Sequence, residues 1–188
     1  MANVNHSSLT DPYLHEPKGI ASANANEVYT SNGSGSGVWK PHHHYVGAYV
    51  AFDSATPAYT KATTTSYSVL NPTLVTSVSE GFTVTNSPNA RLVYSNTIDI
   101  SAHITLSTST QLATGSSTPT NWAIYKNGSI LAGSETIRAI ASSSWGSVSV
   151  IGYTPLTSGD YIEVYSKATG SVSVQYASFF ISIMGVPA

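Results

Sequence analysis

The sequence contains no cysteine, which excludes disulfide bonds, thiol nucleophiles and thiolate metal sites. Charged residues are also few: 7 Lys and Arg and 9 Asp and Glu among 188 residues give a formal net charge of -2 at pH 7. Phosphate backbones and anionic lipids are bound through concentrated positive charge, which this composition does not supply. We therefore expect neither a nucleic acid nor a membrane as a partner.

Long apolar runs are missing as well. No segment approaches the roughly 20 consecutive apolar residues that span a bilayer, and no basic stretch followed by an apolar one opens the chain as a secretion signal would. These absences predict a protein that is neither secreted by the usual route nor anchored in a membrane. A length of 188 residues suits one domain with an appendage, whose stability must come from packing or subunit association.

Residues 1–44 contain few periodic apolar positions and many turn formers, such as Asn32-Gly33 and the run Ser34-Gly35-Ser36-Gly37. This composition predicts an N-terminal arm that forms no core of its own. A purely solvated linker would not need the apolar and aromatic residues that punctuate the arm, which are Leu9, Tyr13, Leu14, Val28, Tyr29, Val38 and Trp39. We therefore expect the arm to become ordered on a partner.

From Tyr45 onward, short alternating segments of β-branched and aromatic residues are separated by turn residues, which predicts an all-β domain over residues 45–188. The expected strands are 45–52, 64–70, 81–85, 91–94, 97–106, 121–126, 129–131, 135–141, 147–153, 161–167 and 171–184. Asn127-Gly128 separates two of them and predicts a type I′ hairpin turn, because both central residues of that turn need positive φ.

The phase of the alternation indicates which side chains face the core. In the final expected strand, Val172, Val174 and Tyr176 share one face, whereas Phe179, Ile181 and Ile183 share the opposite one. Either a bulge intervenes, or a subunit interface covers the second face. Tyr161 and Tyr165 lie opposite Ile162 and Val164 in the preceding strand. We predict a subunit interface at or near Tyr161, Tyr165, Phe179 and Phe180.

Several landmarks together carry a family resemblance. They are the opening Tyr45-Val46-Gly47-Ala48-Tyr49-Val50-Ala51-Phe52, the alternating stretch from Ile98 to Leu106, the Tyr125-Lys126-Asn127-Gly128 hairpin, the Gly159-Asp160 turn and Ser178-Phe179-Phe180. With them, residues 45–188 resemble a C1q/tumour-necrosis-factor-like (TNF-like) domain. The resemblance implies an antiparallel jelly-roll sandwich, and a homotrimer that binds other molecules.

The N-terminal arm carries a second resemblance, through Leu14-His15-Glu16-Pro17-Lys18-Gly19, residues 23–29 and the stretch from Asn32 to Trp39. It resembles the arms at the front of tailed-bacteriophage virion proteins, including capsid decoration proteins and head or tail fibres. This implies a structural virion protein at the capsid surface, a homotrimeric decoration, cement or head-fibre protein bound to the major capsid protein or another virion protein. The implied capsid-anchoring residues are Leu14, His15, Glu16, Pro17, Lys18, Val28, Tyr29 and Trp39.

Two other functions remain open. The first is a tail-fibre or adhesin tip whose loops 108–121 and 142–146, with Trp122 and Trp145, contact a host surface glycan, because indole faces suit sugar rings. The second is a polysaccharide-degrading enzyme that would draw two carboxylates from Glu80, Asp99, Glu135, Asp160 and Glu163. Asp160 is already expected to serve in a turn, and the Gly33–Gly37 run matches neither a nucleophile elbow nor a nucleotide-binding loop. We expect no catalytic activity and no cofactor.

Histidine is the remaining metal-ligand type, and it is concentrated in His42-His43-His44. Neighbouring side chains on an extended chain point to opposite sides, so one triplet cannot surround one ion. Three copies could converge on a trimer axis, and His103 is a second candidate for that axis. We expect a polar junction between arm and domain, and no metal.

Overall fold

The computed structural model describes residues 23, 27–31, 37–41, 43–50, 57–142 and 144–188. The chain divides after His42 into an N-terminal unit and a larger β unit, two residues before the boundary expected at 44. Leu14, His15, Glu16, Pro17 and Lys18 lie outside the described residues. No helix among the described residues is long and apolar enough to cross a membrane.

The described part of the N-terminal unit is a hairpin of β1 (Glu27–Ser31) and β2 (Gly37–Pro41). The strands pair antiparallel with Tyr29 opposite Trp39, and the two rings meet edge to face with centroids 5.4 Å apart. Gly37 is required here, because a Cβ on it would collide with the Thr30 carbonyl oxygen. A two-stranded hairpin on its own is only marginally stable in water.

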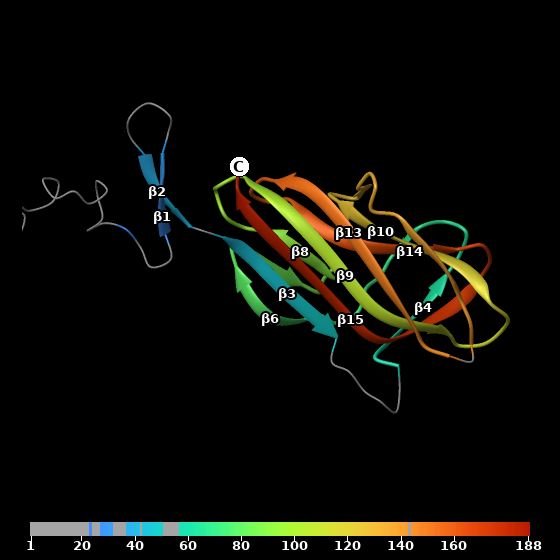
Figure 1. The fold of residues 1–188 in the computed structure, drawn as a ribbon. Helices are drawn as coiled ribbons and strands as arrows, with labels where there is room; N and C mark the ends of the chain where they lie inside the picture. The colour runs from blue at the N-terminus through green and yellow to red at the C-terminus, as the bar shows by residue number, and fades with distance from the viewer. Residues whose placement is uncertain (1–22, 24–26, 32–36, 42, 51–56, 143) are drawn as a thin grey trace, which may run out of the picture. The chain divides into compact units, whose positions relative to one another are not determined.

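The larger unit is a sandwich of two antiparallel sheets (Figure 1). The first sheet has the order β13 (Gly146–Leu156), β9 (Ile100–Leu112), β15 (Val172–Pro187), β3 (His44–Val50) and β6 (Val75–Glu80), with β4 (Tyr59–Thr63) paired to β15. The second has the order β11 (Ser129–Ile130), β10 (Thr118–Lys126), β14 (Tyr161–Ala168), β8 (Arg91–Tyr94) and β7 (Phe82–Thr85), with β12 (Thr136–Ile140) paired to β10 and β5 (Ser68–Val69) to β14.

The strand order is that of a jelly roll. Of its eight principal strands, β3, β15, β9 and β13 are neighbours in the first sheet and β8, β14, β10 and β12 are neighbours in the second. The first and last principal strands, β3 and β15, lie side by side, as two Greek keys require. The predicted fold class, an antiparallel jelly-roll sandwich, is confirmed.

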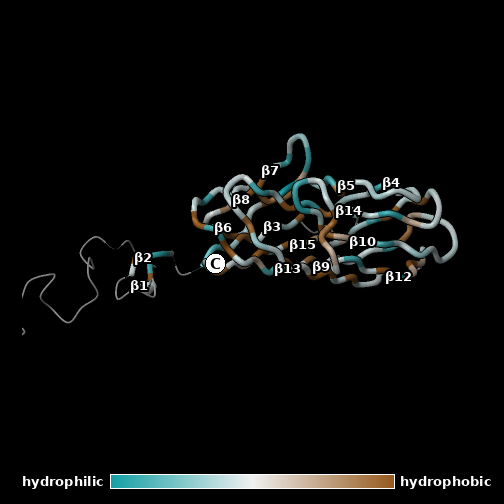
Figure 2. The backbone as a smooth tube through the Cα atoms, turned by 90° about the horizontal axis from the view of Figure 1, so that it is seen from above, coloured by the Kyte–Doolittle hydropathy of each residue, from teal (hydrophilic) through white to brown (hydrophobic). Residues whose placement is uncertain are grey.

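The core lies between the sheets, and alternation along the strands builds it. In β9 every second side chain from Ile100 to Leu112 is buried. Figure 2 shows the same pattern as short brown segments that alternate with white and teal ones along the strands. Trp122 and Tyr176 are buried at the centre, where the indole Nε1 donates a hydrogen bond to the tyrosine hydroxyl at 3.2 Å. The expected strand 97–106 is displaced, because it begins at Ile100 and continues to Leu112.

The final strand changes phase as its sequence indicates. β15 pairs with β4 as far as Tyr176 and with β3 from Phe179 onward. The side chains on both sides of this change, Val174 and Tyr176 before it and Phe179 after it, belong to one core. A local irregularity therefore explains the pattern, without a covered second face. This corrects the expectation for Phe179: its side chain is only 3% exposed and is unavailable to a neighbouring subunit, whereas Phe180 is exposed.

Two strands of the sandwich, β4 and β6, are absent from the sequence prediction. Both lie at sheet edges, and the residues of β6 are almost all exposed. Because an exposed edge strand needs no buried face, its sequence lacks the alternation of apolar residues by which an inner strand is recognised, and it carries hydroxyl-bearing side chains instead. The expected strand 64–70 is reduced to β5. The end of the expected strand 45–52 falls outside the described residues.

Candidate functional site

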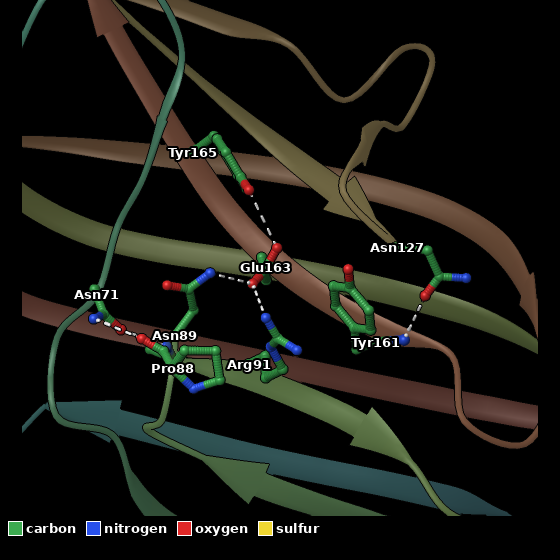
Figure 3. A network of polar contacts seen from close by, with 9 residues as sticks. Asn71, Pro88, Asn89, Arg91, Asn127, Tyr161, Glu163 and Tyr165 are labelled. Carbon is green, nitrogen blue, oxygen red and sulfur yellow. Dashed lines mark hydrogen bonds and ion pairs between the residues drawn. The ribbon is translucent and has the colours of Figure 1, made fainter.

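Two turns predicted from the sequence lie next to each other and are bonded together. Asn127 and Gly128 have φ values of 51° and 77°, as a type I′ turn requires. The Asn127 side chain donates a hydrogen bond to Asp160 Oδ1 at 2.6 Å. It accepts one from the Tyr161 backbone N–H at 2.9 Å (Figure 3). Lys126 Nζ lies 2.9 Å from Asp160 Oδ2. These contacts fix the start of β14 against the end of β10.

Asp160 has a structural role, as expected. Its Oδ2 accepts a hydrogen bond from the Thr157 backbone N–H at 2.8 Å, which closes the turn. Burial alone would raise the pKa of Asp160, but the hydrogen bonds from Thr157, Lys126 and Asn127 outweigh it and lower the pKa to about 2. A carboxylate held ionised by this many donors is a poor proton donor at neutral pH.

Glu163 is the centre of a polar network on the outward side of β14 (Figure 3). Its Oε1 accepts hydrogen bonds from Asn89 Nδ2 at 3.0 Å and from Arg91 Nη2 at 2.9 Å, and its Oε2 accepts one from the Tyr165 hydroxyl at 3.3 Å. The Arg91 guanidinium also lies 4.2 Å from the centroid of the Tyr161 ring. Tyr161 and Tyr165, expected at a subunit contact, are thus both parts of this network.

The Glu163 carboxylate is covered although its neighbours Ile162 and Val164 face the core. Its side chain is 2% exposed, because the segment with Asn89 lies against it and Arg91 reaches it from the neighbouring strand β8. That segment is held by Asn71, whose Nδ2 donates to the Pro88 carbonyl at 3.4 Å. The adjoining cavity holds only about 10 Å³, roughly one water molecule. The geometry fits a structural ion pair better than a site that admits a substrate.

A second cluster lies beside this network on the outer surface of the same sheet. The tyrosine cluster comprises Tyr67, Tyr125 and Tyr165 together with Asn121, Glu135 and Lys167. Its Tyr125 and Tyr165 rings are stacked with centroids 3.8 Å apart, and Tyr67 meets Tyr125 edge to face at 5.8 Å. Glu135 Oε1 accepts from the Tyr67 hydroxyl at 2.5 Å and from Asn121 Nδ2 at 2.9 Å, and Lys167 Nζ lies 3.2 Å from it.

Electrostatics fix the proton positions in the tyrosine cluster. The hydrogen bond from Tyr67, together with those from Lys167 and Asn121, lowers the pKa of Glu135. Burial, followed by the neighbouring carboxylates, raises the pKa of Tyr67, of Tyr125 and of Tyr165. At neutral pH the phenols therefore remain donors and Glu135 remains an ionised acceptor.

The outer surface of the first sheet has the opposite character. Its apolar face comprises Tyr45, Val78, Tyr153, Phe180 and Met184, all of them exposed. Two depressions of about 480 and 380 Å³ adjoin there and share His103 and Met184. No Asp, Glu, Lys or Arg is among the described residues that line them. The His103 ring stacks on its cross-strand neighbour Tyr153 at 4.6 Å.

The remaining predicted site residues are dispersed. Trp122 is completely buried, which corrects its expected contact with a glycan, whereas Trp145 is exposed. Glu135, Asp160 and Glu163 are each paired with a different cation. Val28, Tyr29 and Trp39 are in the N-terminal hairpin. Sequence reasoning missed four residues, for which the only local signal was an outward phase in their strands: Arg91 in β8, Asn121 and Tyr125 in β10, and Lys167 in β14.

The histidine run does not form a metal site within the described part of the chain. His42 lies outside it, and the described residues contain no group of three His, Asp or Glu side chains placed to hold an ion. His44 is completely buried at the start of β3, edge-on to Tyr94, and neither ring nitrogen has a hydrogen-bond partner among the described residues. A Cβ on Gly81 would lie 2.5 Å from the Nδ1 atom of His44, so a larger residue at position 81 would collide with the buried ring.

We expect His44 to make the domain less stable in acid. Burial lowers the pKa of His44 below the ordinary 6.5, and the nearby Glu80 carboxylate opposes this only in part. The unfolded chain therefore takes up a proton that the folded chain does not. The free energy of unfolding should fall as the pH drops below about 6.5, by up to about 1.4 kcal/mol per pH unit.

Urea unfolding between pH 7.5 and 5 measures this slope. The variant His44→Leu should flatten it, and His43→Gln should retain it. An unchanged slope in His44→Leu would show that other groups cause the acid sensitivity.

No family model matches the sequence, and none of the curated proteins compared with it matches. Solved structures similar to this chain include murine APRIL, with 13% identity, a TM-score of 0.49 and coverage of 77% of this chain and 99% of that one. Eiger TNF from S. frugiperda has 12% identity, a TM-score of 0.47 and coverage of 77% and 93%. The PRD1 vertex protein P5 has 12% identity, a TM-score of 0.46 and coverage of 77% and 97%. These values do not indicate the function or partners of this protein.

Proposed function

We propose that the protein is a structural component of a virus particle, a homotrimeric capsid decoration, cement or head-fibre protein anchored to the major capsid protein by its N-terminal arm. In this role it resides at the capsid surface and performs no catalysis. The observation that carries the proposal is the pairing of an uncharged apolar face on the sandwich with an N-terminal unit whose described residues form only a two-stranded hairpin.

The apolar face supports self-association. Isolated exposed apolar residues are ordinary on a protein surface, but adjoining depressions lined by Tyr45, Tyr153, Phe180 and Met184 form a continuous patch. Because no charged side chain lines it, burying it against another copy carries no charge-desolvation cost. We therefore assign the subunit contact to this face, which includes Phe180, and not to Tyr161 and Tyr165.

A three-fold assembly needs a heterologous contact, in which a different patch of the next copy covers this face and the ring closes. The exposed Trp145, just before β13, is an apolar side chain that such a contact can use.

The N-terminal unit supports anchoring. Its hairpin presents Val28 and Val38 to solvent on one side and the Tyr29–Trp39 pair on the other. Two strands alone bury too little to be stable, so docking on a partner would offset the cost of ordering them. Three arms on one trimer would bind cooperatively, since attachment of one raises the effective concentration of the others.

Deletion of residues 1–42 is expected to leave a folded trimer that no longer attaches to virus particles. The division after His42 places the removed residues outside the sandwich. The measurement is co-sedimentation of the full-length and the truncated protein with virus particles that lack this protein, which reports how much of each attaches. The full-length variant Tyr29→Ala/Trp39→Ala is the finer test, and we expect it to weaken attachment at least roughly tenfold. Undiminished attachment of the truncated protein would disprove anchoring by the arm.

The second candidate function is a tail-fibre or adhesin tip that binds a host glycan, which the exposed Trp145 favours. Copy number separates the two functions. Hundreds of copies spread over the head would support decoration, and a few copies at the tail would support a fibre tip.

A further inference from the structure

The tyrosine cluster lies on the outer surface of the second sheet, whereas the proposed subunit contact lies on the outer surface of the first. The inner surfaces of the two sheets pack against each other, so the apolar face can be covered by another copy without that face's contact covering the tyrosine cluster. Its Lys167 and Glu135 side chains are 33% and 43% exposed. We propose that the tyrosine cluster is a binding site for neutral glycans.

The charges of the cluster favour an uncharged ligand. Lys167 is paired with Glu135 within it, and Arg91 is paired with Glu163 beside it, so the surface has no excess of either sign. A surface that bound sialylated or sulfated sugars would need unpaired cations, and one that bound a cation would need unpaired carboxylates. The partner must therefore be recognised by hydrogen bonds and apolar contacts.

The hydrogen-bonding groups match the hydroxyls of a sugar. Glu135 Oε1 carries the bonds from Tyr67 and Asn121 and the contact with Lys167, whereas no described residue donates a hydrogen bond to Oε2. Lys167 Nζ has further protons to donate, and Asn121 Oδ1 can accept. Adjacent sugar hydroxyls act as both donors and acceptors, so they can bridge this free acceptor and the neighbouring donors.

The tyrosines supply apolar surface that is already in place. Tyr125 and Tyr165 hold each other by stacking, and Tyr67 is held by its bond to Glu135 and by Lys167 Nζ, which lies 4.3 Å from the centroid of the Tyr67 ring. Ala123, opposite Tyr165 on the neighbouring strand, is completely buried beneath this surface. Aromatic rings that are already fixed lose little conformational entropy when a sugar ring packs against the ring surface that these contacts leave exposed.

Binding of the full-length protein to a panel of neutral hexose polymers, namely glucans, mannans and galactans, tests the proposal. We expect binding to at least one polymer, weakened at least roughly tenfold by Glu135→Gln and by Tyr67→Ala. Thr83→Ala alters an exposed residue on β7 of the same sheet outside the cluster, and it should bind as the unchanged protein does. Circular dichroism checks that each variant is folded. If Tyr67→Ala does not fold, Glu135→Gln still tests the proposal, because it keeps the shape of the side chain.

Three results would overturn the proposal: no binding to any neutral polymer, binding that persists in both cluster variants, or binding to anionic glycans alone. The proposed anchoring role is measured separately by attachment to virus particles. A cluster variant that loses glycan binding should still attach, so failure of one proposal can be told from failure of the other.

Discussion

The variant Met184→Glu is expected to separate the proposed trimer into folded monomers. Met184 is 59% exposed in the isolated chain and lines both depressions of the apolar face, so an assembly through this face buries it near the centre. A carboxylate there would lose its water without gaining a cation, because the lining residues carry no positive charge. We expect a cost of about 3 kcal/mol per contact, which is roughly a 100-fold weaker association.

Sedimentation velocity at micromolar concentration measures this change. Met184→Leu preserves the apolar surface and should remain a trimer, and Thr83→Glu places the same charge on an exposed position of the other sheet and should also remain one. Circular dichroism of Met184→Glu should be unchanged, because the side chain contributes little to the core. If Met184→Glu remained a trimer, the subunit contact would lie elsewhere. If the unsubstituted protein were already a monomer, the proposed assembly would be wrong.

The fold was predictable because its signals are local. Alternation along β9 and β14 and the turns at Asn127-Gly128 and Gly159-Asp160 each depend on a few neighbouring residues. The shift of phase in β15 was visible in the sequence, but its cause was not. Only the pairing with β4 and β3 shows that both halves face one core, which moves Phe179 away from the surface.

The two polar clusters were not predictable, because strand register brings their members together. Tyr67 and Tyr165 are far apart in the sequence, and only the pairing of β5 and β10 with β14 makes them neighbours of Tyr125. The outward phase of Glu163 predicts exposure, yet the segment that includes Asn89 covers it. Local periodicity reports which face a side chain takes, not what lies over that face.

The ion pair beneath that covering segment should contribute more to stability than the exposed pair of the tyrosine cluster. Replacing Arg91 by methionine keeps the apolar stem that packs near Tyr161 but leaves the Glu163 carboxylate, 2% exposed, without its cation. Removing one partner of a buried pair typically costs 3–5 kcal/mol, and the 21% exposure of Arg91 lowers our expectation to about 2–3 kcal/mol. The melting temperature should fall by roughly 5–10 °C.

Urea and thermal unfolding at one fixed protein concentration measure the loss, since association also shifts apparent stability. In Arg91→Met/Glu163→Gln the buried charge is gone while the side-chain amide oxygen still accepts from Asn89, so at least half of the stability should return. Lys167→Met breaks the more exposed pair with Glu135 and should cost less than about 1 kcal/mol. If Arg91→Met and Lys167→Met caused equally small losses of stability, the burial of Glu163 would not explain why it needs Arg91. The segment that contains Asn89 would then be held mainly by the hydrogen bonds of Asn71 and Asn86.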